Sequence, residues 1–351
     1  MRWADQTLRA GMDIPMERAK IHEVVANLKR LPVTSIDIKV RAWERYNLLP
    51  LNEEQSQLFR GIIKGTVEEV KLAHSLGFKR VIVGERLEQG DGLTKQNIAA
   101  LRTGNKRNLA MGFLLENASQ YSVEKIKKIW RGVFLAGAET FIYNDGDSLL
   151  HPLLTTKILG QLVSSMPGRI EFIAHNAYGL ATANALGAIQ AGVRRIGTAV
   201  AGVGCQGHAA LEEILMAQKH LLGQKIGETQ EIATICKTIL AAIKVPISST
   251  KAIIGDELFA HESGIHVDGV LKNPQLYEPF PPEEVGLTRK LVIGKHSGTA
   301  SIQAKFRQWN VVVPELAVNK ILERVRRLAV VQKSPITDQQ LWAIYTAAVG
   351  E

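Results

Sequence analysis

The sequence predicts an α/β protein, a (β/α)8 barrel followed by a small, mostly helical arm. Short runs rich in β-branched residues alternate with helical stretches at intervals of about 25 to 35 residues. A polar or glycine-containing turn follows each strand. Seven clear units and a less distinct eighth fit a closed barrel better than an open sheet. The length of 351 residues accommodates one such domain and a smaller appendage.

Alternation along the chain predicts the strands, and apolar residues three and four positions apart predict the helices. The strands cover residues 3–8, 33–40, 78–84, 109–115, 140–144, 169–175 and 195–200. The helices begin near residues 13, 122, 152 and 208, or cover 53–75 and 228–243. Asp13 and Pro15 are helix-start signals, and Ser122 is a predicted N-cap.

The chain changes character near Lys244 and Pro246, where turns containing His and Pro replace the regular alternation. We therefore predict a barrel domain over residues 1–250 and an arm with a helical, dimer-forming subdomain over 251–351. Thr337 and Gln340 have the spacing of a capping box. One helical face of this part is apolar and comprises Val318, Ile321, Leu322, Val325 and Leu328.

Composition narrows the functional classes. The 43 basic and 34 acidic side chains give a net charge of +9, but the basic residues are scattered and aromatic residues are only 6%, which disfavours nucleic-acid binding. The sequence has no apolar stretch of about 18 to 20 residues and no signal-peptide pattern, so we expect a cytoplasmic protein. Two cysteines agree with a reducing compartment. Cys236 has the spacing of a core residue.

Residues 202–207 read G-x-G-x-x-G, which is also the pattern of a dinucleotide-binding turn. The motif follows six β/α units instead of opening the fold, and no second strand ending in Asp or Glu comes after its helix. We interpret its glycines as the requirement of a tight strand-to-helix turn.

His175 is the first candidate site residue. It ends a short β-branched run and precedes a polar turn and a small-residue helix. In a barrel of this type, the C-terminal ends of the strands carry the chemistry.

Several strings together resemble the homocitrate synthase and 2-isopropylmalate synthase family, most closely the homocitrate synthases associated with nitrogenase cofactor assembly. The similarity extends from the first strand to the last helix. It is carried by DQTLR at 5–9, HNxxGLATAN at 175–184, AALEE at 209–213, HESGIHVDG at 261–269 and GKHSG at 294–298. The resemblance implies a TIM-barrel acyltransferase that joins acetyl-CoA to a 2-oxo acid such as 2-oxoglutarate. It also implies that a divalent metal and a catalytic arginine, Arg9 in this chain, polarise the keto oxygen.

The family pattern of metal ligands is largely substituted in this chain. Arg9 is present, but the acidic residue that follows it in the family is Ala10, and the first His of the family's H-x-H is Ile173. His175 remains, and His208 stands where the family has Asn. Because such metals need about three protein ligands, we expect the ordinary site to be lost.

The resemblance also implies a set of substrate and arm residues. Asp37 and Asp145 correspond to substrate-binding positions in the barrel, and Glu262 to one in the arm. His266 and Tyr277 match a His and a Tyr that reach, in this family, from the arm of one subunit into the barrel of its partner.

Three hypotheses follow from this pattern. The chain is a catalytically impaired subunit that donates its arm, in a homodimer or in a heteromer with an active homocitrate synthase. Alternatively, it is an active acyltransferase with a metal site rebuilt from His175, Cys205 and His208, because Cys and His suit zinc. Thirdly, it is a regulatory protein that binds a carboxylate through Arg9, Lys39 and Arg41. An ion pair of Arg9 with Asp37 or Asp145 is the structural alternative for that arginine.

Overall fold

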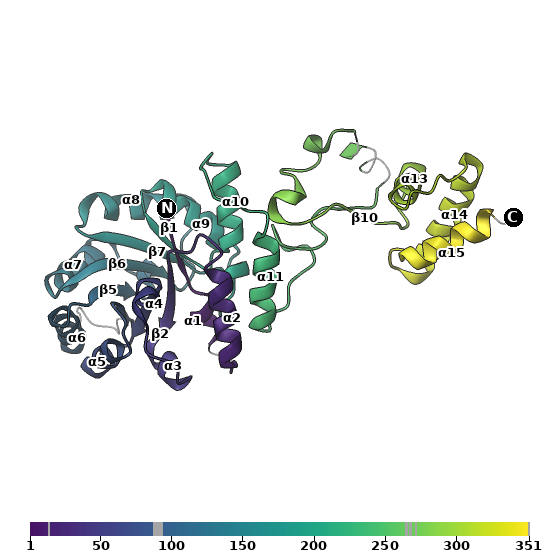
Figure 1. The fold of residues 1–351 in the computed structure, drawn as a ribbon. Coiled ribbons are helices and arrows are strands. Elements are labelled where there is room, and N and C mark those ends of the chain that lie inside the picture. Colours follow the sequence, from purple (N-terminus) through teal and green to yellow (C-terminus); the bar gives the residue numbers. More distant parts are fainter. Residues whose placement is uncertain (13–14, 87–93, 264–265, 267–268, 271, 350–351) are drawn as a thin grey trace. The chain divides into compact units, whose positions relative to one another are not determined.

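The computed structural model describes all residues except 13–14, 87–93, 264–265, 267–268, 271 and 350–351 (Figure 1). It divides into two compact units. The first comprises Met1–Gly227 with Ile235–Pro246, and the second comprises Glu228–Thr234 with Ile247–Glu351.

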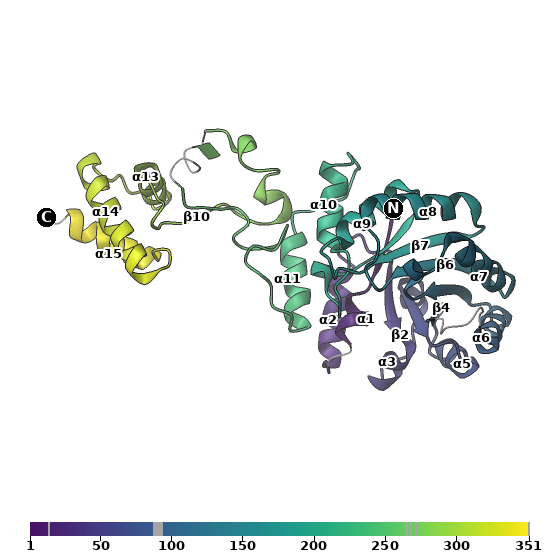
Figure 2. The ribbon, with the colours of Figure 1, turned by 180° about the vertical axis from the view of Figure 1, so that it is seen from behind.

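The first unit is a closed barrel of parallel strands, as the sequence predicts. Its strands lie in chain order, and β1 pairs with β8 to close the ring. The helices surround the strands on the outside (Figures 1 and 2). The strands are β1 (Arg2–Asp5), β2 (Ser35–Lys39), β3 (Phe59–Ile63), β4 (Arg80–Glu85), β5 (Ala110–Leu115), β6 (Ala138–Asp145), β7 (Arg169–Ala174) and β8 (Arg195–Thr198).

Helices follow each of the barrel strands. They are α1 (Thr7–Gly11), α2 (Arg18–Leu28), α3 (Val40–Arg45), α4 (Glu53–Leu58), α5 (Val67–Ser75), α6 (Lys95–Lys106), α7 (Val123–Leu135), α8 (Pro152–Ser165), α9 (Ala181–Gln190), α10 (Leu211–His220) and α11 (Ile232–Ala242), with short 3-10 turns η1 (Ala118–Gln120) and η2 (Val200–Gly202). Helix α11, which comes after β8 and α10, contributes residues from Ile235 onward to this unit. The predicted N-cap is confirmed, because the Ser122 side chain accepts a hydrogen bond from the amide of Lys125. Asp13 lies outside the described residues, and α2 begins only at Arg18.

The single helix predicted over residues 53–75 is wrong. The segment folds as α4, then β3, then α5, and β3 is the strand that the sequence left indistinct. Asn52 forms a capping box with Gln55 that starts α4. Gly61 then allows close packing of the strand, because a Cβ there would lie 2.6 Å from Cγ2 of Val40. Gly65, with φ of 82°, ends the strand before α5 begins.

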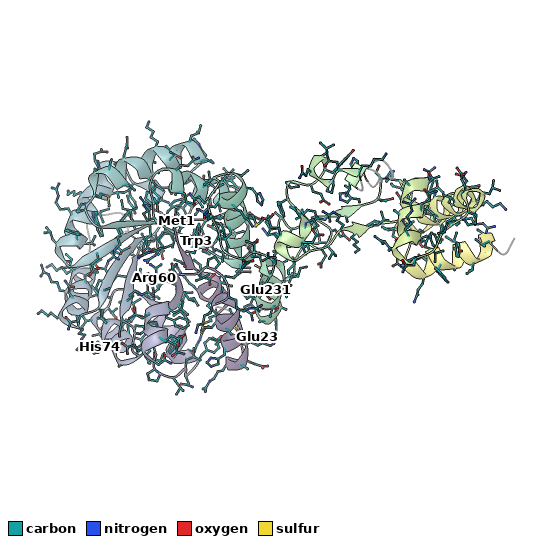
Figure 3. All side chains as sticks on the ribbon, turned by 45° about the horizontal axis from the view of Figure 1, so that its top comes forward. Met1, Trp3, Glu23, Arg60, His74 and Glu231 are labelled. Atoms are coloured by element: carbon teal, nitrogen blue, oxygen red, sulfur yellow. The ribbon has the colours of Figure 1, made fainter. Side chains whose placement is uncertain are left out.

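The barrel interior contains two layers of side chains. One layer is apolar, and the other, two residues nearer the N-terminal ends of the strands, is charged. Ile82, Leu114, Ile142 and Ile173 form the apolar cluster, and Ile62 packs against it. Ile173 is therefore a core residue, with 2% of its surface exposed. The charged layer contains Arg60, which Figure 3 labels among the barrel strands.

The second unit combines short strands with a helical bundle. Strands β9 (Ala260–His261) and β10 (Lys290–Leu291) pair in parallel, and 3-10 turns η3 (Pro274–Leu276) and η4 (Pro282–Val285) lie between them in sequence. The bundle consists of α13 (Thr299–Gln308), α14 (Glu315–Gln332) and α15 (Asp338–Val349). The predicted apolar face of α14 packs into its core. The predicted capping box is confirmed, because Thr337 and Gln340 exchange backbone-to-side-chain hydrogen bonds of 2.9 and 3.2 Å.

Among the described residues, no helix is both long enough and apolar enough to cross a membrane.

Candidate functional site at the barrel mouth

Two histidines meet at the C-terminal end of the barrel. His175 directly follows β7, and His208 lies in the turn after β8 and η2. The two residues form an isolated antiparallel bridge, and their ring centroids are 4.7 Å apart. The structure therefore brings together two of the three residues of the predicted rebuilt metal site.

The glycine-rich turn makes room for His208. A Cβ on Gly204, whose φ is 141°, would lie 2.5 Å from the imidazole of His208, and a Cβ on Gly207 would lie 2.9 Å from Cβ of Asn176. The closed barrel also confirms that this G-x-G-x-x-G segment is a strand-to-helix turn of a barrel. Its glycines allow the turn to fold closely over His208.

Both imidazoles are held in the neutral form near pH 7. Burial and the charge of Arg9 lower the pKa of His175. Burial and the neighbouring His175 lower the pKa of His208 to about 4. The Nδ1–H of His208 donates to the carbonyl of Val203 over 2.7 Å, so its Nε2 carries the free lone pair. Nδ1 of His175 is buried without a hydrogen-bond partner among the described residues.

Arg9 contributes positive charge to this mouth. It lies on α1, and its Nη1 donates to Oε1 of Gln6 over 3.2 Å. Its charge acts on the pKa of both histidines and of Asp37. Ala10 follows it on the same short helix. Arg41 instead pairs with Glu44 and Glu69, at 3.1 and 3.4 Å.

Asp37 lies at the centre of a buried ionic network. Arg60 donates from Nε and Nη2 to its two oxygens over 2.6 and 2.8 Å, and Gln6 donates to it over 2.6 Å. Nη1 of Arg60 also binds both oxygens of Glu171, which accepts a further bond from Arg195 over 2.6 Å. Burial alone would raise the pKa of Asp37, but Arg60 and Gln6 outweigh it and lower that pKa. Asp37 is 0% exposed, and both of its oxygens are bound by neighbouring side chains. Its predicted substrate role stays a prediction.

Asp145, the second predicted substrate residue, holds its own loop. Its two oxygens accept hydrogen bonds from the amides of Leu149 and Leu150 over 3.0 and 3.1 Å, and the residue is fully buried. Its negative charge reaches His175, where it opposes the lowering of the pKa. The carboxylate thus fixes the turn after β6, and its predicted contact with substrate stays a prediction.

Asp5 has a comparable structural role at the start of the DQTLR string. It accepts hydrogen bonds from the amide and hydroxyl of Thr7, whose Oγ1 in turn accepts from the amide of Val200. This chain joins β1 to the segment after β8. Burial raises the pKa of Asp5 to about 7.

The donor groups at the mouth do not fit the divalent metal that the resemblance implies. Ala10 and Ile173 provide no ligand atom, and Cys205 is exposed. Over the described part of the chain, no group of three or more His, Cys, Asp or Glu side chains is placed to hold a metal ion. Of the predicted three-residue site, only His175 and His208 meet, whereas catalytic zinc sites use about three protein ligands.

The arm residues lie in the second unit. His266 is exposed, and its ring centroid lies 5.5 Å from that of Tyr277, which is 40% exposed. Oε1 of Glu262 accepts a hydrogen bond from the amide of His296 over 2.9 Å, so this carboxylate holds the GKHSG turn. A Cβ on Gly294 would lie 2.5 Å from the same oxygen. Four residues of the HESGIHVDG string, at 264–265 and 267–268, lie outside the described residues.

Sequence reasoning missed Arg60, Glu171 and Arg195. Arg60 and Glu171 are charged residues inside otherwise apolar strands, and their side chains share the inward alternation with the barrel core. A charged residue at an inward position of an apolar strand is the sequence signal that could have identified Arg60 and Glu171. Charged residues are almost never fully buried unless they are paired, so two of them on inward positions predict an internal ion pair.

Comparison with known sequences gives consistent results over both units. Residues 62–239 match a family described as HMGL-like, and residues 253–333 match one described as homocitrate synthase post-HMGL domain-like. A homocitrate synthase of Frankia alni is 42% identical over 338 residues, covering 88% of this chain and 93% of the relative. A 2-isopropylmalate synthase 2 of Caldanaerobacter subterraneus subsp. tengcongensis is 33% identical over 338 residues, covering 95% and 84%.

Solved structures share the barrel. A hydroxymethylglutaryl-CoA lyase of Pseudomonas aeruginosa has a TM-score of 0.59 at 15% identity, covering 70% of this chain and 93% of that one. An HMG-CoA lyase of Brucella melitensis has a TM-score of 0.53 at 13% identity, covering 69% and 96%. At such identities the likeness concerns the fold.

Proposed function

This chain belongs to the homocitrate synthase and 2-isopropylmalate synthase family, and we propose that it is a homocitrate-synthase-like subunit that donates its arm to an active paralogue. The family reaction condenses acetyl-CoA with a 2-oxo acid. In this proposal, the chain's own barrel is impaired in that reaction, while its arm completes a site in a partner subunit.

The observation that carries the proposal is the state of the barrel carboxylates. Asp37 is bound by Arg60 and Gln6, and Asp145 by two backbone amides, so these two carboxylates are engaged in contacts that support the fold. The condensation needs a base for a weakly acidic methyl proton and positive charge at the keto oxygen. His208, with its pKa lowered to about 4, is a weak base.

The arm supports the second half of the proposal. His266 and Tyr277 are accessible and adjacent, and Glu262 ties the HESGIHVDG string to the GKHSG turn. An imidazole and a phenol together can hold or move a proton at a reacting group. A partner barrel with an intact metal site would polarise the keto group of the 2-oxo acid, and the arm residues would assist proton transfer at that site.

A complementation experiment tests this proposal. The chain is co-expressed with a homocitrate synthase whose own arm histidine has been replaced by Ala, and the mixed oligomer is isolated through two different tags. Release of free thiol from acetyl-CoA in the presence of 2-oxoglutarate is then measured. We expect the unmodified chain to restore activity to the inactive partner, because it contributes His266 in trans.

Two variants of the chain make the test specific. His266→Ala should abolish the restoration, whereas His296→Ala, which replaces another exposed histidine of the same unit, should preserve it. The proposal fails if no mixed oligomer forms, or if both variants restore activity equally. Elemental analysis separates the alternative of a rebuilt active site: the chain alone would then contain zinc and release thiol without a partner.

A further inference from the structure

A cavity of about 740 Å³ lies at the end of the barrel opposite the histidines. Arginines line it at the starts of three strands, because Arg2, Arg169 and Arg195 are the first residues of β1, β7 and β8. Arg194 lines it as well. The cavity therefore lies at the floor of the barrel, where the N-terminal ends of these strands meet.

The charges in this floor are unbalanced. Among the residues that the structure describes, four arginines line the cavity, and Glu171 is the single acidic residue in its lining. Glu171 is already shared, since its oxygens bind both Arg60 and Arg195. Arg169 has a partner outside the cavity, Glu139, at 2.7 Å. The cavity thus has more cationic groups than its carboxylates can neutralise.

Two of the arginines lack an acidic partner. Within the part of the chain that the structure describes, no ion pair is formed by Arg2 or Arg194. Arg2 and Arg195 are also direct neighbours in the β1–β8 ladder. Like charges directly opposite each other on neighbouring strands destabilise a sheet unless something compensates them.

Arg80, in the interior next to this floor, is also affected by the positive charge of neighbouring arginines. Burial, and after it the charges of Arg60 and Arg195, lower the pKa of Arg80 to about 10. Its Nε is buried without a hydrogen-bond partner among the described residues. An additional negative charge nearby would relieve this repulsion.

We propose that the floor cavity binds a small organic polyanion, a molecule with two or more phosphate or carboxylate groups. Arginine forks recognise both groups through paired, charge-assisted hydrogen bonds. Val163 and Ile170 add an apolar wall, which suits a carbon skeleton between the anionic groups. The volume is within the range of about 300 to 1,000 Å³ that is typical of small-molecule sites. This site is independent of the arm-donor function.

Isothermal titration calorimetry at constant ionic strength tests the proposal, with sodium pyrophosphate and propane-1,2,3-tricarboxylate as separate probes. We expect saturable binding of at least one probe, and which one binds identifies the anionic group. Arg194→Ala and Arg2→Ala should each weaken it about tenfold or more, because each removes a charge-assisted contact.

A matched control locates the binding. Arg131→Ala removes an exposed arginine on α7 and should leave the affinity within about twofold. Circular dichroism of each variant checks the fold, and Arg194→Gln replaces any variant that does not fold. Absence of binding by both probes overturns the proposal. Binding that is insensitive to Arg194→Ala and Arg2→Ala, or equally reduced by Arg131→Ala, also overturns it.

Discussion

Replacing Arg60 with Met tests the buried network most directly. Arg60 is 3% exposed and donates to both Asp37 and Glu171, which are 0% and 2% exposed. Breaking a buried ion pair by removing one partner costs about 3 to 5 kcal/mol. Because one guanidinium serves two carboxylates here, we expect a loss of about 4 to 5 kcal/mol in the free energy of unfolding at pH 7.

The pH dependence of this loss is a second signature. In the native protein the pKa of Asp37 is lowered, so its stabilising contribution is present above about pH 4 and is lost as the pH falls below that value. Without Arg60, burial dominates and raises that pKa. The difference in the free energy of unfolding between Arg60→Met and the native protein should therefore become smaller by more than about 1 kcal/mol as the pH falls from 7 to 5.

Urea unfolding followed by tryptophan fluorescence provides the measurement. The background carries Trp309→Phe and Trp342→Phe, so that the remaining tryptophans report on the barrel. Arg131→Met on the exposed face of α7 is the matched control and should change the stability by less than about 0.5 kcal/mol. A loss below about 1 kcal/mol for Arg60→Met, or a loss independent of pH, would refute the reasoning.

Two further predictions concern packing and pH. Gly197→Ala should destabilise the barrel by about 1 to 3 kcal/mol, because its Cβ would lie 2.6 Å from Cγ1 of Ile173. Gly160→Ala in α8 should stabilise it by up to about 1 kcal/mol, because no atom of the described residues lies within 4 Å of the added Cβ. Urea unfolding of both variants checks this. The pKa of His208 is lowered to about 4, so this residue favours the folded state most above about pH 6.5. Its contribution to the free energy of unfolding should fall by about 3 kcal/mol as the pH drops from 6.5 to 4. His208→Gln should flatten that slope, and an unchanged slope would contradict the assignment.

Local chemistry in the sequence determined much of the fold. Alternating and helical periodicities predicted the barrel, and the caps at Ser122 and Thr337 formed as expected, because such signals depend on residues only three or four positions apart. The sequence also showed that Ala10 and Ile173 offer no ligand atoms. Strand β3 was missed because its five residues directly follow the helical signal of α4.

The tertiary structure alone decided which charged groups meet. Arg60 binds Asp37, 23 positions away, and Glu171, 111 positions away, and no local pattern specifies such pairs. The floor cavity likewise exists only because closure of the barrel brings β7, β8 and β1 together. The physical reason is that Coulombic contacts and cavities depend on distance in space, whereas periodicity and capping depend on distance along the chain.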